Sequence, residues 1–409
     1  MFLEQMLLYS NSTERRFSMK KYSYLIIGGG IAANAAISGV RKKDATGSIG
    51  ILTDEAYPPY SRPLLSKGLW KNTSEEKLWF SNDEKNVDIL TNQTVVKIDP
   101  ESHSVMTNTG EIFNYNTLLI TTGTITRELP FEDKDIIYYR DYASYLKLKA
   151  LSEKKNEFAV VGAGFIGSEI AAALAMNDKK VVLLESGAGI GWRVFPSEIV
   201  AYLNEYYASH QVQVLTGVTV NDIKPAGDRH HILFGSGKTL DVDGVIAGVG
   251  VKANSGLAQA AGLAVGDGIK VNSYLETSLP DIFAAGDVAA FHSSALDKIV
   301  RVEHEDNAVN MGMIAGENMA GGNLEYDYIP MFYSDLFDIG YEAVGTIDSR
   351  LDMIVDWKEP FKKGVIYYCQ DGFIKGVLLW NEWGKVDQAR ELIREQKWID
   401  KDHLQGLID

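Results

Sequence analysis

The chain has 409 residues, enough for two or three domains that each bury a core. Its 40 lysines and arginines against 55 aspartates and glutamates leave a formal net charge of −15, which argues against a general nucleic-acid or anionic-membrane surface. Apolar residues at 45% and charged residues at 23% are typical of a folded protein and exclude wholesale disorder. The single cysteine, Cys369, excludes a disulfide within the chain and a cysteine-based zinc site.

Residues 1–21 are expected to form a disordered extension, because the opening apolar run is too short and too interrupted for a signal peptide. A targeting or partner-binding role for this segment is the alternative. No stretch approaches the ~18 consecutive apolar residues that a membrane helix needs. We therefore expect a cytoplasmic protein without a membrane span.

A strand–turn–helix–strand pattern opens the main part of the chain. The apolar run 24–27 enters the turn Gly28–Ala33, small helix formers follow to Val40, and a second strand over 49–52 ends near Asp54. This order is that of a dinucleotide-binding βαβ unit.

The same order returns later in the chain. Strand 158–161 enters Gly162–Gly167, an alanine-rich helix continues to Met176, and strand 181–184 ends at Glu185. One Gly-x-Gly-x-x-Gly turn is weak evidence, but two on complete βαβ frames are strong evidence for two dinucleotide-binding folds. A glycine-rich turn in an ordinary α/β domain is the alternative for each.

The chemistry of these turns predicts which residues contact a dinucleotide. The first glycine permits the tight turn, the second admits a pyrophosphate, and the third, replaced by alanine in the first motif, lets helix and strand pack closely. The helix N-terminus offers free N–H groups to the phosphates. The turn residues predicted to bind are Gly28, Gly30 and Ala33 in the first motif, and Gly162, Gly164, Phe165, Ile166 and Gly167 in the second.

Asp54 and Glu185 lie at the offset expected of a ribose-hydroxyl acceptor. A carboxylate at Glu185 would repel a 2′-phosphate, and no Arg or Lys occurs between Ser186 and Trp192, although Arg193 follows. The second site is therefore predicted to prefer NADH over NADPH.

Two such folds in one chain resemble the FAD-dependent pyridine nucleotide-disulfide oxidoreductase superfamily, in which the first fold binds FAD and the second NAD(P)H. Further segments carry this resemblance: Leu119–Gly123, Gly248–Asn254 and Thr277–Asp287. The segments 59–67, 301–308, 315–319, 331–335, 340–343 and 376–381 are most similar to apoptosis-inducing factor and to ferredoxin and rubredoxin reductases. Thr126 and Tyr333 depart from this pattern, where proline and tryptophan are usual, and no long insertion stands near the C-terminus.

The resemblance implies an α/β protein with two Rossmann-like nucleotide-binding domains and a C-terminal α/β interface domain. The implied boundaries are residues 22–138 with 266–328 for the FAD domain, 139–265 for the NAD domain and 329–409 for the C-terminal domain. A helix is expected over 301–319, with its N-terminus toward the flavin.

The resemblance also implies the reacting residues. Lys67 should lie near flavin N5 and pair with Glu169, while His304 and Tyr333 line the site. The alternatives are solvated charges for Lys67 and Glu169, a structural histidine and a core aromatic. The other residues implied for FAD binding are Arg62, Thr122, Gly123, Arg127, Gly286, Asp287 and Glu303, and Gly250 is implied for NAD binding. The histidines show no metal-ligand spacing, so no metal site is predicted.

A chain with one cysteine cannot pass electrons through a dithiol, and Cys369, in a strand-like run, is expected to be buried. Electrons should therefore pass from NADH to flavin N5 and then directly to an acceptor: a ferredoxin- or rubredoxin-type carrier, or a quinone. The alternative is a redox-sensing interaction protein, similar to apoptosis-inducing factor, whose NADH charge-transfer complex controls oligomerisation. A homodimer is left open.

Overall fold

The computed structural model describes residues 20–82, 86–398 and 404–408. The expected extension lies outside these residues except for Lys20 and Lys21, which begin strand β1 (Lys20–Ile27). In the described part of the chain, no helix is long and apolar enough to cross a membrane.

The first sheet has the order β3-β2-β1-β6-β5-β4, with β19 beside β6, and is parallel apart from the antiparallel strands β4 and β5. Its other strands are β2 (Ile49–Leu52), β3 (Val87–Leu90), β4 (Val95–Asp99), β5 (Ser104–Thr107), β6 (Ile112–Ile120) and β19 (Ile282–Ala284). Strand β2 is a continuous buried apolar run, and β1 and β6 end in such runs, because both faces of the sheet are covered there.

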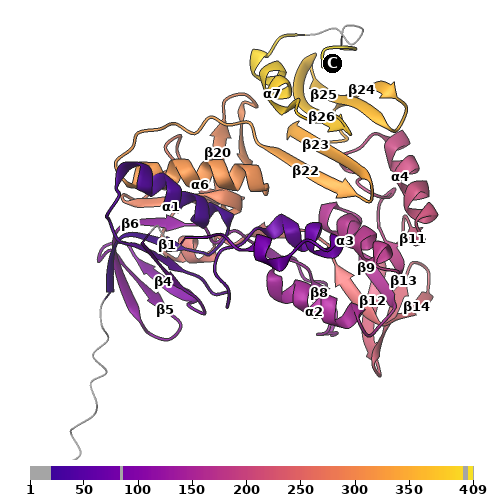
Figure 1. Cartoon of the computed structure of the whole chain (residues 1–409), viewed down its shortest axis with the longest axis horizontal. Helices are drawn as coiled ribbons and strands as arrows, with labels where there is room; N and C mark the ends of the chain where they lie inside the picture. The colour runs from indigo at the N-terminus through magenta and orange to yellow at the C-terminus, as the bar shows by residue number, and fades with distance from the viewer. Residues whose placement is uncertain (1–19, 83–85, 399–403, 409) are drawn as a thin grey trace, which may run out of the picture.

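Helices α1 (Ile31–Lys43) and α6 (Glu305–Met319) lie side by side over this sheet (Figure 1). Their backbones touch through glycines: a Cβ at Gly39 would lie 2.0 Å from the Met313 carbonyl oxygen, and one at Gly316 would lie 2.1 Å from that of Ala36. The expected helix over 301–319 was wrong at its start. Residues 298–301 form strand β21 (Lys298–Arg301), which pairs with β20 (Ala289–Ser293).

The second sheet is wholly parallel, in the order β11-β10-β9-β15-β8. Its strands are β8 (Ile137–Tyr138), β9 (Glu157–Val161), β10 (Lys180–Leu184), β11 (Val212–Leu215) and β15 (Gly244–Ala247), and its helices are α2 (Tyr142–Ser152), α3 (Phe165–Met176) and α4 (Ser197–Ser209). A three-stranded antiparallel sheet adjoins it: β12 (Val220–Ala226), β13 (Arg229–Phe234) and β14 (Lys238–Val242).

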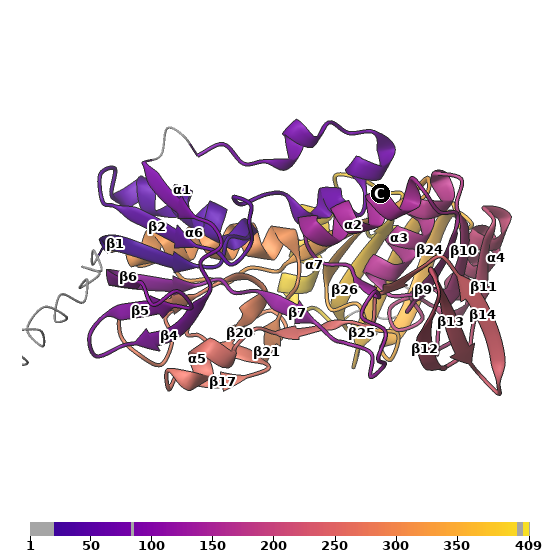
Figure 2. The same ribbon diagram turned by 90° about the horizontal axis from the view of Figure 1, so that it is seen from below.

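An antiparallel ribbon of β7 (Thr124–Thr126) and β16 (Val251–Ala253) runs between the two sheets (Figure 2). The remaining short elements are α5 (Gly256–Ala260), β17 (Val265–Gly266), β18 (Gly268–Lys270) and the 3₁₀ turns 62–65, 68–71, 75–78 and 286–288.

The C-terminal part is a five-stranded antiparallel sheet, in the order β22-β23-β26-β25-β24, with helix α7 packed on it. Its elements are β22 (Met331–Leu336), β23 (Ile339–Gly345), β24 (Asp352–Glu359), β25 (Lys363–Gln370), β26 (Phe373–Trp380) and α7 (Val386–Glu395). Cys369 is buried on β25, as predicted.

The α/β class is confirmed, with one sheet that is parallel apart from β4 and β5 and a second that is wholly parallel. The domain boundaries stay a prediction. Strand β8, at the end of the segment assigned to the FAD domain, pairs with β15 of the second sheet, so the first crossing between the sheets falls before Ile137.

Candidate functional site

A cavity of about 980 Å³ runs along the carboxyl end of the first sheet and reaches the second and the C-terminal sheets. Helix α1 begins in its wall, and the loop at 62–67, the N-terminus of α3 and the start of β22 form the rest. The predicted residues that line it are Gly28, Gly30, Asp54, Arg62, Lys67, Thr122, Gly123, Phe165, Ile166, Glu169, Gly286, Asp287, Glu303, His304 and Tyr333.

The first turn has the geometry of a pyrophosphate site. Gly28 adopts φ +108, and a Cβ there would lie 2.3 Å from the Thr121 carbonyl oxygen, so the tight turn requires glycine. A Cβ at Gly30 would meet no atom within 4 Å, because it would point into the open cavity. The first N–H groups of α1 face this space, and the residues therefore fit the diphosphate of FAD.

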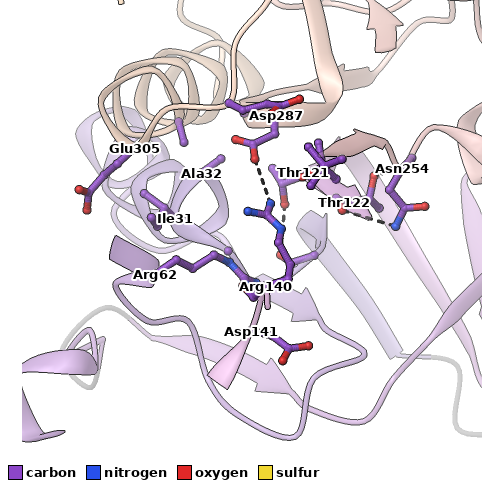
Figure 3. A pocket seen from close by; sticks show the side chains of 18 of the residues that line it. Ile31, Ala32, Arg62, Thr121, Thr122, Arg140, Asp141, Asn254, Asp287 and Glu305 are labelled. Atoms are coloured by element: carbon purple, nitrogen blue, oxygen red, sulfur yellow. Dashed lines mark hydrogen bonds and ion pairs between the residues drawn. The ribbon is translucent and has the colours of Figure 1, made fainter. Parts of the chain in front are cut away.

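Asp287, which the resemblance implies for FAD binding, lines the cavity. The Arg140 guanidinium donates to its Oδ2 at 3.0 Å (Figure 3). The Arg301 guanidinium donates to the Asp287 carbonyl at 3.0 Å and pairs with Glu303 at 2.7 Å. Arg140 carries no motif in the sequence, so it was not predicted.

Arg62 is held in the cavity wall by an ion pair with Glu55. Its Nη1 donates to the Tyr60 hydroxyl at 3.1 Å and to the Arg140 carbonyl at 3.3 Å. The Glu55 carboxylate therefore pairs with arginine, while its neighbour Asp54 is exposed on the cavity side.

Lys67 and Glu169 form the buried ion pair that the resemblance implies. Nζ of Lys67 lies 2.8 Å from Oε1 of Glu169, and their side chains are 12% and 3% exposed. Two hydroxyls also donate hydrogen bonds to the Glu169 carboxylate: Ser66 to Oε2 and Ser334 to Oε1, each at 2.5 Å. Glu169 is on α3, Ser66 precedes Lys67, and Ser334 is on β22, so three separate parts of the chain meet at one carboxylate. Neither serine was predicted.

Tyr333 lies next to this pair, with Nζ of Lys67 5.0 Å from the centre of its ring. Burial, together with the carboxylates of Glu305 and Asp335, raises the pKa of Tyr333 to about 12, so its hydroxyl stays protonated. Burial also raises the pKa of Glu305, while Lys67 opposes that shift. Glu305, at the first position of α6, was not singled out in the sequence.

His304 occupies the position before the first residue of α6, and its ring stacks on Phe332, with ring centres 4.4 Å apart and planes 6° from parallel. Burial lowers the pKa of His304 to about 4, which leaves the imidazole neutral near pH 7. Phe332 meets Phe165 edge-on at 4.9 Å. The predicted His304 and Phe165 are thus joined through an aromatic ring that was not predicted.

The second turn repeats the geometry of the first, with its three glycines outside the cavity wall and Phe165 and Ile166 within it. Gly162 adopts φ +94, and a Cβ on Gly167 would lie 1.9 Å from the Gly162 carbonyl oxygen. A Cβ on Gly164 would meet no atom within 4 Å, so this turn fits a pyrophosphate as well.

Glu185 is buried behind this turn. Its Oε2 accepts from the Ala163 N–H at 2.7 Å, and its Oε1 accepts from the Gly187 N–H at 2.7 Å and from Trp192 Nε1 at 3.1 Å. It therefore also holds its own loop in place.

The structure does not bring Arg127 into the cavity. Its backbone N–H donates to the Gly250 carbonyl at 2.9 Å, and its side chain is exposed beside the β7–β16 ribbon. Gly250 and the buried Ala33 also lie outside the cavity wall. Among the described residues, no group of three or more His, Cys, Asp or Glu side chains is placed to hold a metal ion.

Family models match most of the chain. Residues 22–312 match the pyridine nucleotide-disulphide oxidoreductase model. Residues 315–359 and 354–395 match the model of the C-terminal part of mitochondrion-associated apoptosis-inducing factor.

Curated relatives are similar over nearly the full chain. Mitochondrial apoptosis-inducing factor 1 of Dictyostelium discoideum is 30% identical over 98% of this chain and 84% of its own length. Peroxisomal monodehydroascorbate reductase 1 of Arabidopsis thaliana is 31% identical over 92% of this chain and 94% of its own.

Two solved structures share the fold at lower identity. The reductase in a covalent putidaredoxin reductase–putidaredoxin complex has a TM-score of 0.87 at 27% identity, covering 95% of this chain and 96% of that one. A ferredoxin reductase from Rhodopseudomonas palustris has a TM-score of 0.86 at 28% identity, covering 93% and 96%.

Proposed function

Because the chain belongs to the pyridine nucleotide-disulphide oxidoreductase family and is an FAD-dependent NADH oxidoreductase, we propose that it transfers electrons from NADH to a small redox carrier of the ferredoxin or rubredoxin type, or to a quinone. Bound FAD would supply a ring that can take up a hydride from NADH and pass its electrons on to the acceptor. The observation that carries this proposal is the buried Lys67–Glu169 pair in the cavity wall.

Lys67 supplies a fixed positive charge to the cavity. An ammonium group beside the flavin ring would stabilise the negative charge that the ring gains on reduction. Glu169 offsets the cost of burying the Lys67 ammonium while the flavin is oxidised. Ser66 and Ser334 donate to the two oxygens of this carboxylate and so fix its position beside the ammonium. The arrangement holds the charged groups in place.

Electrons leave without a dithiol in this proposal. Cys369 is the only cysteine, and it is buried among the residues of the C-terminal sheet, outside the wall of the cavity. Two structural neighbours favour a protein acceptor: the ferredoxin reductase from Rhodopseudomonas palustris and the putidaredoxin reductase–putidaredoxin complex. The proposal includes a cytoplasmic location, with which a single reduced cysteine is consistent.

We also propose that Glu185 sets the preference for NADH. Among the described residues, its Oε2 accepts only the Ala163 N–H, which leaves one lone pair for a ribose hydroxyl. The buried carboxylate would repel a 2′-phosphate.

Steady-state turnover tests the proposal. The FAD-loaded protein with NADH should reduce a rubredoxin, a ferredoxin or a quinone many times faster than oxygen, and Cys369→Ala should turn over at the wild-type rate. Oxidation of NADH that no carrier accelerates would contradict it. A change of oligomeric state on adding NADH, without carrier turnover, would instead support a redox-sensing protein similar to apoptosis-inducing factor.

A further inference from the structure

A second cavity, of about 370 Å³, shares no lining residue with the first. Leu296 and Lys298 of the β20–β21 hairpin form one wall. The loop 346–351 after β23 forms the other wall, together with Gln370 at the end of β25 and Lys375 near the start of β26. The cavity therefore lies where the hairpin meets the C-terminal sheet.

The charges around this cavity are unbalanced. Lys298, Arg350 and Lys375 border it, and among the described residues Asp348 is the one acidic residue in its lining. Arg350 forms an ion pair with Asp348, in which Nε of Arg350 lies 2.9 and 3.0 Å from the two carboxylate oxygens. Two ammonium groups are thus left over.

Neither lysine finds a carboxylate within ion-pair distance among the described residues. Nζ of Lys298 donates to the Thr346 hydroxyl at 3.1 Å. Nζ of Lys375 lies 5.7 Å from the centre of the Phe373 ring. Partial burial lowers the pKa of Lys298, Lys375 and Arg350 add to that shift, and Asp348 opposes it. An anion in the cavity would relieve this repulsion.

These three positively charged side chains contrast with the net charge of the whole chain, which is −15. Three cations around one cavity of such a protein do not follow from a generally basic surface. Guanidinium and ammonium groups are the side chains that bind phosphate oxygens most strongly.

We propose that this cavity binds a phosphate group, free or on a small organic monoester, between Lys298, Arg350 and Lys375. The Thr346 hydroxyl lies within reach of the same ammonium, and Leu296 and Leu351 supply an apolar wall for the carbon part of a monoester. The bound anion ties the β20–β21 hairpin to the C-terminal sheet.

Calorimetric titration of the FAD-loaded full chain tests this site. Inorganic phosphate and glycerol 1-phosphate are titrated at constant ionic strength, with NAD⁺ at saturation to occupy the second glycine turn. We expect one saturable site per chain. Lys298→Gln and Lys375→Gln should each weaken binding about tenfold, since each removes one charge-assisted hydrogen bond. Lys362→Gln, an exposed lysine outside the cavity, is the matched control and should bind as the wild type does.

The two anions distinguish the source of the phosphate. Tighter binding of glycerol phosphate identifies an organic monoester as the ligand, and equal or weaker binding identifies free phosphate. The visible flavin spectrum of each variant reports that it is folded. No saturable binding of either anion, or equal binding by both cavity variants and the wild type, would overturn the proposal. Carrier reduction would be unaffected by that result, because the two cavities share no residue.

Discussion

The two glycine turns have the same backbone and different surroundings. Gly28 and Gly162 both adopt positive φ, and both helices start at a glycine whose missing side chain leaves open space. The first turn opens into the large cavity, whereas a carboxylate, Glu185, ties the second to its own loop. The shared backbone fits a pyrophosphate in both turns, and the side chains behind the two turns differ.

The helices after the turns differ in the same way. Position five of α1 is Ala35, a small buried residue, and its neighbours Ala32 and Ala36 lie against Gly312 and Gly316 of α6. Position five of α3 is Glu169, which carries the buried ion pair. One dinucleotide fold thus supplies close helix packing, and the other supplies a charge to the shared cavity.

The difference between the two helices is tested first by Glu169→Gln, which should have the largest effect on stability and on the rate of flavin reduction. The Lys67 ammonium would lose its buried partner, and breaking such a pair costs about 3 to 5 kcal/mol. We expect a lower midpoint of urea unfolding and slower reduction of the flavin by NADH. The exposed Glu198→Gln, in the first turn of α4, is the control. Wild-type stability and rate in Glu169→Gln would show that the pair is a solvated contact.

Exchanging the third turn residue tests how closely each helix packs. The Cβ of Gly167→Ala would meet the Gly162 carbonyl at 1.9 Å, so we expect a loss of about 3 kcal/mol. The reverse change, Ala33→Gly, should cost only about 1 kcal/mol, since it adds chain freedom and removes one methyl. Urea unfolding of both variants checks the difference. Equal losses would mean that the two turns pack equally closely.

Ser334→Ala should have an intermediate effect. It removes one of two hydroxyl donors to Glu169, and a hydrogen bond to a charged group is worth about 2 kcal/mol. The redox potential of the flavin should shift as well, which loss of packing alone would not produce. Ser209→Ala, whose hydroxyl donates to an exposed carbonyl, should change neither quantity. An unchanged potential in Ser334→Ala would limit the serine to a structural role.

The two candidate ribose acceptors should show the smallest effects. Glu185→Gln should weaken NADH binding about tenfold and narrow the preference over NADPH, because a buried acceptor becomes a neutral amide. Asp54→Asn should weaken FAD binding less, since Asp54 is exposed and water can replace its contacts. Titration with each nucleotide gives both constants. A larger loss of nucleotide affinity in Asp54→Asn than in Glu185→Gln would contradict the view that Glu185 is the more important ribose acceptor.

The turns could be predicted because they depend on local glycines, each with a fixed spacing to its strand and helix. The centre around Glu169 could be predicted only in part. Lys67 and Glu169 came from a resemblance, whereas Ser66, Ser334 and Arg140 reach the cavity through contacts between residues distant in sequence. Helix α6 begins at Glu305, four residues after its predicted start, because Arg301 ends strand β21, which pairs with β20.

Anaerobic stopped-flow mixing tests most directly whether electrons pass from NADH through the Lys67–Glu169 cavity to a carrier. The FAD-loaded protein is first mixed with NADH and then with oxidised rubredoxin or ferredoxin, while the flavin band and the long-wavelength charge-transfer band are followed. We predict rapid loss of the flavin band with NADH and its rapid return with the carrier. Slow reduction to a persistent charge-transfer band that no carrier or quinone discharges would contradict the account.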